Sequence, residues 1–196
     1  VKYIHANGFC AFSKREENMQ PYEELKKAYT IQVTENQAFV QENFNIASKL
    51  VSNLIAFLDL PSTPKTPDTP PILQFLRPKL EGGFAPVAQL EEAVLSFPEG
   101  KFQFGLGLLL ETDGEVQSKQ VATFTYNCER TDDQITVFVL DKAFDLPFTS
   151  SDALEVGEIS EFVFKELLEG LNWRISDEIE KTRVGFDVTP VDEDIA

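Results

Sequence analysis

Apolar and polar side chains alternate in three successive runs between residues 101 and 140, and this pattern constrains the fold most. Side chains of a β-strand point alternately to the two faces of a sheet, so each run predicts a strand with one buried face. The runs are joined directly by turns near 112–115 and 131–133. We therefore expect a three-stranded antiparallel meander. Its first run would bury Phe102, Phe104, Leu106, Leu108 and Leu110, and its second Ala122, Phe124, Tyr126 and Cys128.

A long helix is predicted before the meander. No Pro or Gly occurs between residues 22 and 58, and apolar residues recur there every three or four positions, most clearly over 38–59. Pro21 suits the first turn of such a helix. The β-branched residues within 29–35 favour an extended conformation, so we expect the helix to break near residue 33.

A second helix is predicted after the meander. Ser151 and Asp152, with Glu155 three residues on, form the pattern of an N-cap with a capping box. This helix would extend to about Trp173 and carry an apolar stripe made of Ile159, Phe162, Val163, Leu167, Leu168 and Leu171. A short helix opening at Pro86 is also expected, and the end of the chain from Val188 is expected to fray.

Proline recurs every third residue after the first helix, at Pro61, Pro64, Pro67 and Pro70. A period of three is typical of a polyproline II helix. Docking motifs of this kind usually carry a basic residue beside the prolines, and here only Lys65 does so, while the Thr-Pro pairs also fit phosphorylation sites. We favour the interpretation as a stiff connector.

These elements predict an α+β protein: a long N-terminal helix, a Pro-rich connector, and a small antiparallel β-meander with a C-terminal helix packed on it. The expected boundaries are an N-terminal helical segment at 1–60, the connector at 61–71, an α+β core at 72–188 and an acidic tail at 189–196, within one compact domain.

The formal charge of −16 is concentrated in the later part of the chain. Residues 111–196 hold 21 acidic and seven basic side chains, a net charge of −14. Such a surface repels nucleic acids and anionic membranes, and it attracts basic proteins. No apolar run approaches the roughly 20 residues of a membrane span. An acidic surface that only confers solubility is the alternative interpretation.

His5, Cys10 and Cys128 offer little metal or catalytic chemistry. Structural zinc needs four Cys or His ligands, and the chain has two Cys and one His. A Cys10–His5 catalytic pair requires the two side chains to be adjacent, which the sequence does not impose. Two free, buried thiols are expected rather than a disulfide. Gly105 and Gly107 form only a fragment of a dinucleotide-binding fingerprint, and close packing in a strand explains them better.

Carboxylates are the plentiful functional groups, and two sets lie in the expected hairpin loops. Weak candidates for metal ligands are Glu111, Asp113 and Glu115 in the first loop, and the second loop holds Glu129, Asp132 and Asp133. The two loops leave opposite ends of the middle strand, so these sets would not converge on one site. The pattern matches neither an EF-hand loop nor an aromatic-lined glycosidase cleft.

A third acidic set lies on and just before the C-terminal helix. Its members are Asp152, Glu155, Glu158, Glu161, Glu166 and Glu169. Like charges at helical spacing slightly destabilise an isolated helix, so this stripe is a candidate surface for a cationic partner. A solvated helix face is the simpler interpretation.

The charge asymmetry and the lack of a coherent catalytic set favour a non-enzymatic, cofactor-free module. We expect its acidic C-terminal half to dock a basic protein partner, as an inhibitor, immunity protein or adaptor would. The alternative is a carboxylate- or metal-dependent hydrolase that uses the acidic hairpin loops. Self-assembly through the long helix is a third hypothesis, but the wide apolar face fits a globular core better. A cytoplasmic location is expected, with secretion left open because the chain begins at Val1.

Overall fold

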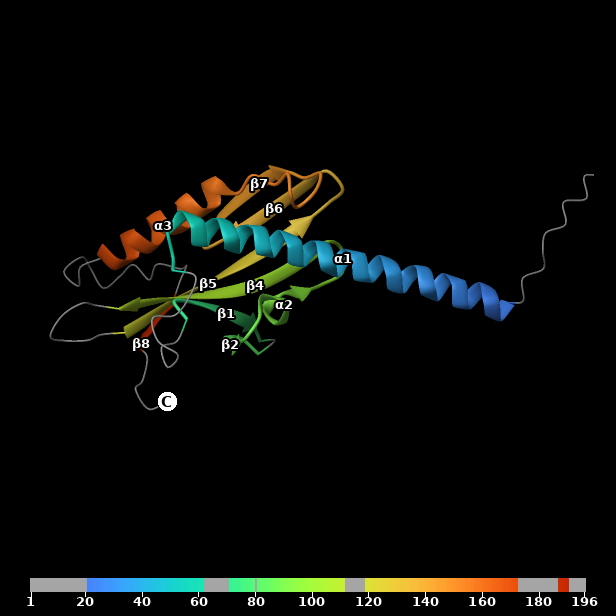
Figure 1. Cartoon of the computed structure of the whole chain (residues 1–196), viewed down its shortest axis with the longest axis horizontal. Coiled ribbons are helices and arrows are strands. Elements are labelled where there is room, and N and C mark those ends of the chain that lie inside the picture. The colour runs from blue at the N-terminus through green and yellow to red at the C-terminus, as the bar shows by residue number, and fades with distance from the viewer. Residues whose placement is uncertain (1–20, 62–70, 80, 112–118, 173–186, 191–196) are drawn as a thin grey trace, which may run out of the picture. The chain divides into compact units, whose positions relative to one another are not determined.

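An antiparallel sheet of eight strands is the centre of the fold in the residues that the computed structural model describes, which are 21–61, 71–79, 81–111, 119–172 and 187–190. The chain divides into two compact units, Val1–Gln37 and Ala38–Ala196, and the sheet belongs to the second. Helix α1 (Pro21–Phe57) begins in the first unit, and helix α3 (Gly157–Asn172) lies in the second (Figure 1). The protein is α+β, as the sequence predicts.

The two longest strands, β4 (Lys101–Glu111) and β5 (Lys119–Arg130), form a hairpin in the middle of the sheet. Strand β6 (Gln134–Val139) pairs with β5, which confirms the predicted meander. Strand β7 (Lys142–Pro147) then pairs with β6 and adds a fourth strand to the meander.

The predicted alternation is confirmed along this hairpin. Every residue expected to face inward from β4 and β5 is buried except Leu110, which is half-buried. Phe104 lies opposite Tyr126, and their stacked rings have centroids 4.9 Å apart. The buried face continues across β6 through Ile135, Val137 and Val139.

The sheet is larger than the predicted meander. Strand β1 (Leu73–Pro78) pairs with β4, and β2 (Phe84–Val87) pairs with β1. Strand β3 (Leu95–Ser96) also pairs with β4, and β8 (Asp187–Pro190) pairs with β5. Strands β2, β3 and β8 have four residues or fewer, too few for alternation to identify them, and the six residues of β1 do not alternate between apolar and polar. Strand β8 includes residues of the segment expected to fray.

The prediction of a helix that opens at Pro86 is wrong. Pro86 lies in β2, opposite Leu76 of β1, and the nearby helix α2 comprises only Leu90–Ala93. Strand β2 ends the order of strands in the sheet, and at an edge the missing N–H of proline removes no ladder hydrogen bond.

Helix α1 continues through residue 33, so the predicted break there is also wrong. Thr30 and Thr34 donate their hydroxyls to carbonyl oxygens four residues earlier, at 2.8 and 2.9 Å. These bonds satisfy the β-branched polar side chains inside the helix, which removes part of their preference for an extended strand.

Helix α3 begins at Gly157, later than the predicted N-cap at Ser151 and Asp152. The residues before it form a loop that inserts Leu154 and Val156 into the core, where they are 3% and 2% exposed. Burial of these side chains outweighs the capping pattern, which describes only local hydrogen bonding.

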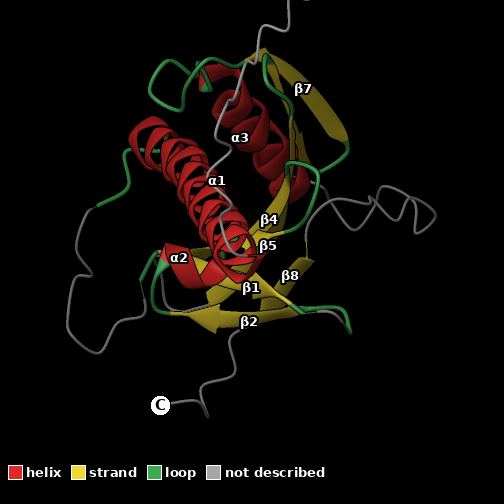
Figure 2. Cartoon of the chain, turned by 90° about the vertical axis from the view of Figure 1, so that its right-hand side faces the viewer, coloured by secondary structure: helices red, strands yellow, loops and turns green. Residues whose placement is uncertain are grey.

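Helix α3 and the part of α1 from Ala38 onward lie side by side over the sheet (Figure 2). Their inward residues and the inward face of the strands form one hydrophobic core. Helix α1 contributes Ile46, Leu50 and Leu54, and α3 contributes Ile159, Val163 and Leu167. The predicted packing of the C-terminal helix on the sheet is therefore confirmed. Residues 62–70 of the Pro-rich connector, and Trp173, lie outside the described residues.

Candidate functional site

The seam between α1 and α3 is held by a series of contacts between residues far apart in the sequence. Three are hydrogen bonds and the last is a contact between aromatic rings. The loop before α3 makes the first two contacts: the Ser151 N–H donates to Glu42 Oε1 at 3.0 Å, and Lys49 Nζ donates to the Asp152 carbonyl at 3.3 Å. Helix α3 itself makes the other two. Ser160 Oγ donates to Asn53 Oδ1 at 2.7 Å, and the ring centroids of Phe57 and Phe164 lie 5.9 Å apart.

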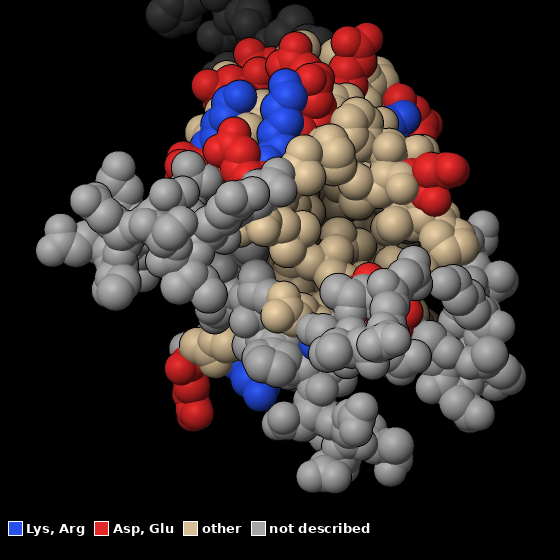
Figure 3. Space-filling model, turned by 90° about the vertical axis from the view of Figure 1, so that its left-hand side faces the viewer, with Lys and Arg blue, Asp and Glu red and all other residues tan. Residues whose placement is uncertain are grey.

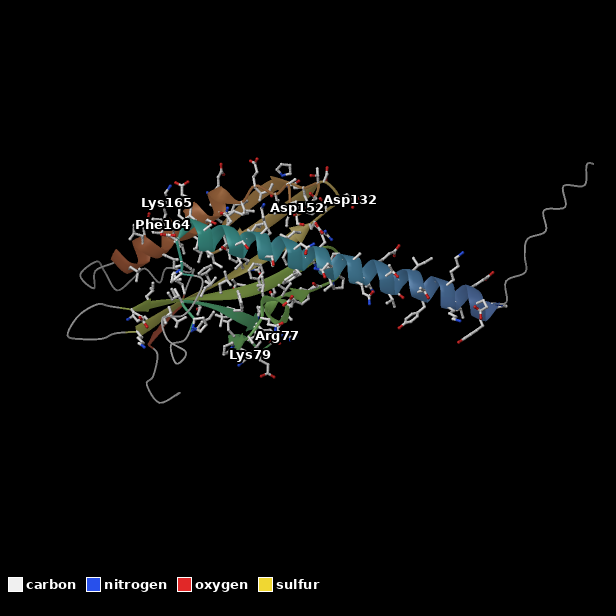
Figure 4. All side chains as sticks on the ribbon, viewed as in Figure 1. Arg77, Lys79, Asp132, Asp152, Phe164 and Lys165 are labelled. Carbon is white, nitrogen blue, oxygen red and sulfur yellow. The ribbon has the colours of Figure 1, made fainter. Side chains whose placement is uncertain are left out.

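A polar hollow lies at one end of this seam, beside the loop that precedes α3. Its volume is about 390 Å³, and it is lined by Asn45, Ser48, Lys49, Ser52, Ser151 and Asp152. Figure 4 places Asp152 toward this end of the seam and Phe164 toward the other. The lining carries hydroxyl, amide, ammonium and carboxylate groups, so this end of the seam suits hydrogen bonding rather than apolar contact.

The opposite end of the seam carries four exposed apolar side chains, which we call the apolar ridge. Phe57 and Phe164 are 46% and 40% exposed, and Leu168 and Leu171 are 46% and 49% exposed. At about 100° per residue, the three residues from α3 lie within a narrow arc on the side of the helix that faces α1. Such a cluster, in contact through its two rings, is a candidate surface for protein binding.

This ridge was not predicted from the sequence, which indicates only that Leu168 and Leu171 belong to the apolar stripe of the helix. Both side chains are exposed in the structure. The predicted stripe spans about two thirds of the helix circumference at about 100° per residue, and only its central residues Ile159, Val163 and Leu167 are buried. The width of the stripe was therefore the available signal, since a helix on a flat sheet buries a narrower face.

The acidic set divides into two groups in the structure. Asp152 and Glu155 lie in the loop before α3 and are exposed, whereas the other four residues are on the helix. Among these four, Glu158, Glu161 and Glu169 are exposed and share one side of α3, and Glu166 is half-buried.

Lys165 lies within the acidic side of α3 and was not part of the sequence argument. Its ammonium group is 2.7 Å from Glu161 Oε1. This hydrogen bond, together with the positive charge of Lys165, lowers the pKa of the Glu161 carboxyl. The pair is exposed, so it offsets the like-charge repulsion along α3 only modestly.

Figure 3 faces the side of the molecule where α1 and α3 end. It shows a broad uncharged surface, and acidic side chains with a few basic ones border it. The apolar ridge and the acidic side of α3 therefore adjoin, because residues 161–171 contribute to both.

The loop carboxylates are separated, as predicted. Glu111 and Glu129 lie at opposite ends of the β4–β5 hairpin, and each pairs with a lysine on the neighbouring strand, at 3.5 Å with Lys119 and 3.2 Å with Lys101. Asp113 and Glu115 lie outside the described residues. Among the residues that are described, no group of three His, Cys, Asp or Glu side chains is placed to hold a metal ion.

Cys128 is a free thiol that is buried in the core. Burial raises the pKa of this thiol far above its usual range, and burial likewise raises the pKa of the neighbouring Tyr126. A thiol that stays protonated is a poor nucleophile, so Cys128 is a packing residue. Cys10 and His5 lie outside the described residues.

The close-packing interpretation of Gly105 and Gly107 is confirmed. A Cβ on Gly105 would lie 2.8 Å from the ring of Phe84, and one on Gly107 would lie 3.0 Å from Val121. A side chain at Gly105 would therefore displace the ring of Phe84, and one at Gly107 would require Val121 to shift by a few tenths of an ångström.

No family model, no curated protein and no solved structure matches this chain. Within the described part of the chain, neither long helix is apolar enough over its length to cross a membrane.

Proposed function

We propose that this chain is a non-enzymatic protein-binding module whose acidic C-terminal half docks a basic protein partner, as an inhibitor, immunity protein or adaptor does. The apolar ridge beside the acidic side of α3 is the observation that carries this proposal. An acidic surface alone is equally compatible with simple solubility, whereas two exposed aromatic rings in contact, with exposed leucines on the same side of α3, add nothing to solubility.

The arrangement resembles the anatomy of a protein interface. Such interfaces have an apolar centre that excludes water and a polar rim that sets orientation and encounter rate. Here Phe57, Phe164 and Leu168 would form the centre, and Glu158 and Glu161 would lie at the rim. The complementary surface has an apolar side chain flanked by lysine or arginine.

Two variants and two matched controls test this proposal. The ridge variant combines Phe164→Ser with Leu168→Ser, and its control is Phe138→Ser, which changes a 38% exposed phenylalanine on β6. The charge variant replaces Glu155, Glu158 and Glu161 with Gln, and its control makes the same change at the exposed residues Glu81, Glu91 and Glu99.

Proteins captured by the wild-type chain from its own cell extract would be identified, purified and titrated against all five proteins by calorimetry. We expect a basic partner whose affinity falls at least about tenfold with the ridge variant, because interface centres hold most of the binding energy. The charge variant should bind more weakly and show a shallower salt dependence. Equal affinity for each variant and its control would contradict the proposal.

A metal- or carboxylate-dependent hydrolase stays the alternative prediction. Glu111 and Glu129 each form an ion pair with a lysine, so a metal ion at either carboxylate would compete with an ammonium group. A rise in melting temperature on addition of Ca²⁺, Mg²⁺ or Mn²⁺ would favour this alternative, because a ligand of the folded state stabilises it by mass action.

A further inference from the structure

The first compact unit presents a second exposed apolar face, on the part of α1 from Pro21 to Gln37. Tyr22, Leu25 and Tyr29 are 71%, 70% and 67% exposed. Their spacing of three and four residues places them on one side of the helix, and Val33 continues that side. Ile31, 49% exposed, lies on the opposite side.

This stretch of helix is about 25 Å long, at a rise of about 1.5 Å per residue. Most helices in proteins are stabilised by burial of their apolar side rather than by helix propensity alone. Burial of Tyr22, Leu25 and Tyr29 would therefore stabilise the helix in which they lie.

The charge of the first unit indicates what kind of surface covers this face. Residues 1–37 hold five acidic and five basic side chains and are neutral overall, so residues 38–196 carry the whole net charge of −16. A basic partner gains no attraction from a neutral segment. The second units of two copies repel one another because both are strongly acidic. The first units are neutral, so contact between them meets the least repulsion.

We propose that two copies of this chain pair through Tyr22, Leu25, Tyr29 and Val33, with the two helices antiparallel. This inference does not depend on the proposed docking of a basic protein. In an antiparallel pair the two acidic units are joined to opposite ends of the paired helices, because each unit follows its helix in the chain at Ala38. Those ends are about 25 Å apart, roughly three Debye lengths at physiological ionic strength. A parallel pair would bring both acidic units to the same end.

The face is also self-complementary in the antiparallel direction. With Tyr29 opposite Tyr29 of the other copy, Leu25 lies opposite Val33, and Tyr22 lies opposite Asn36. The arrangement obeys twofold symmetry, so each contact occurs twice. Tyrosine hydroxyls at the seam stay within reach of water or of the asparagine amide.

The paired surface is smaller than the roughly 800 Å² per partner of a standard interface, so the dimer is expected to dissociate on dilution. Sedimentation velocity over a roughly hundredfold range of protein concentration would measure it. We expect the wild-type chain to shift from monomer to dimer, with a dissociation constant in the range of about 1–100 µM. Higher salt should strengthen pairing, because it screens repulsion between the acidic units.

The variant combines Leu25→Gln with Tyr29→Gln, and the matched control is Ile31→Gln on the opposite side of the same helix. We expect the variant to stay monomeric and the control to dimerise as the wild type does. Circular dichroism at low concentration would establish that all three chains are folded.

Three outcomes would overturn this proposal: a wild-type chain that stays monomeric throughout, a variant that dimerises normally, or a control that loses dimerisation equally. The opposite response to salt separates the two proposals, since docking of a basic protein weakens as salt rises while pairing of two acidic copies strengthens. Failure of either proposal leaves the other intact.

Discussion

The two parts of α1 carry similar apolar patterns but lie in different surroundings. In the part from Pro21 to Gln37, the apolar side chains Tyr22 and Leu25 are about 70% exposed. In the part from Ala38 onward, Leu50 and Leu54 are 1% and 0% exposed because the sheet covers them. One periodicity therefore specifies which side of a helix is apolar, but it does not specify what covers that side.

The two compact units also differ in charge, since the first is neutral and the second carries −16. Under the two proposals, this difference in charge separates the partners that the two units would bind. An apolar face beside acidic groups suits a basic protein, and an apolar face on a neutral helix suits a second copy. The kind of partner that an exposed apolar surface would bind can therefore be inferred only together with the charge around that surface.

The largest expected difference between the two parts of α1 is in stability. Leu54→Ala should lower the free energy of unfolding by about 2–5 kcal/mol, because it leaves a cavity in the core. Leu25→Ala should change that free energy by less than about 0.5 kcal/mol, because its side chain is exposed. Urea unfolding at a low protein concentration would measure both. Similar losses for the two substitutions would show that the parts are packed alike.

Hydroxyl groups that donate hydrogen bonds to the two parts of α1 provide a smaller contrast in stability. Ser160→Ala should cost about 1–3 kcal/mol, because Asn53 Oδ1 then loses its donor inside the α1–α3 seam. Thr34→Ala also removes a hydrogen bond, but water replaces it and alanine favours a helix, so we expect a change within about 0.5 kcal/mol. Equal effects in the same urea titration would mean that the seam is open to water.

The dependence of stability on pH should reveal the buried Cys128 thiol in the second unit. The Cys128 thiol has a raised pKa in the folded state, so above the unfolded value of about 8.5 the unfolded chain has lost a proton that the folded chain retains. The contribution of the Cys128 thiol to the free energy of unfolding is complete below about pH 8.5. It is lost as pH rises, by about 1.4 kcal/mol per pH unit. Cys128→Val should remove this slope up to about pH 10, where Tyr126 begins to contribute. An unchanged slope in the variant would assign the effect to other groups.

The sequence was sufficient for the elements with long, regular patterns. Alternation over β4 and β5 and periodicity in α1 and α3 predicted these elements and most of their buried residues, because many positions contribute to each pattern. The acidic residues of α3 were found by the same periodicity. The strands β1, β2, β3, β7 and β8 were not predicted, since a short strand is stabilised by its neighbours more than by its own residues.

Packing alone decided three further features. The loop before α3 has a capping pattern, yet Leu154 and Val156 are more stable in the core than in a helical turn. Leu168 and Leu171 belong to an apolar stripe, yet both side chains stay about half exposed. Lys165 pairs with Glu161 within a side of the helix that the sequence suggested to be uniformly acidic.

By itself, the sequence determined the α+β class, the inward faces of the central strands and the concentration of negative charge after residue 110. These properties depend on local geometry and on composition, which are present in the chain before it folds. Only the tertiary structure decided which apolar residues stay exposed, and it brought Phe57 and Phe164 into contact across the seam. Exposure depends on how much of a side chain the neighbouring elements cover, and a local sequence pattern does not specify that area.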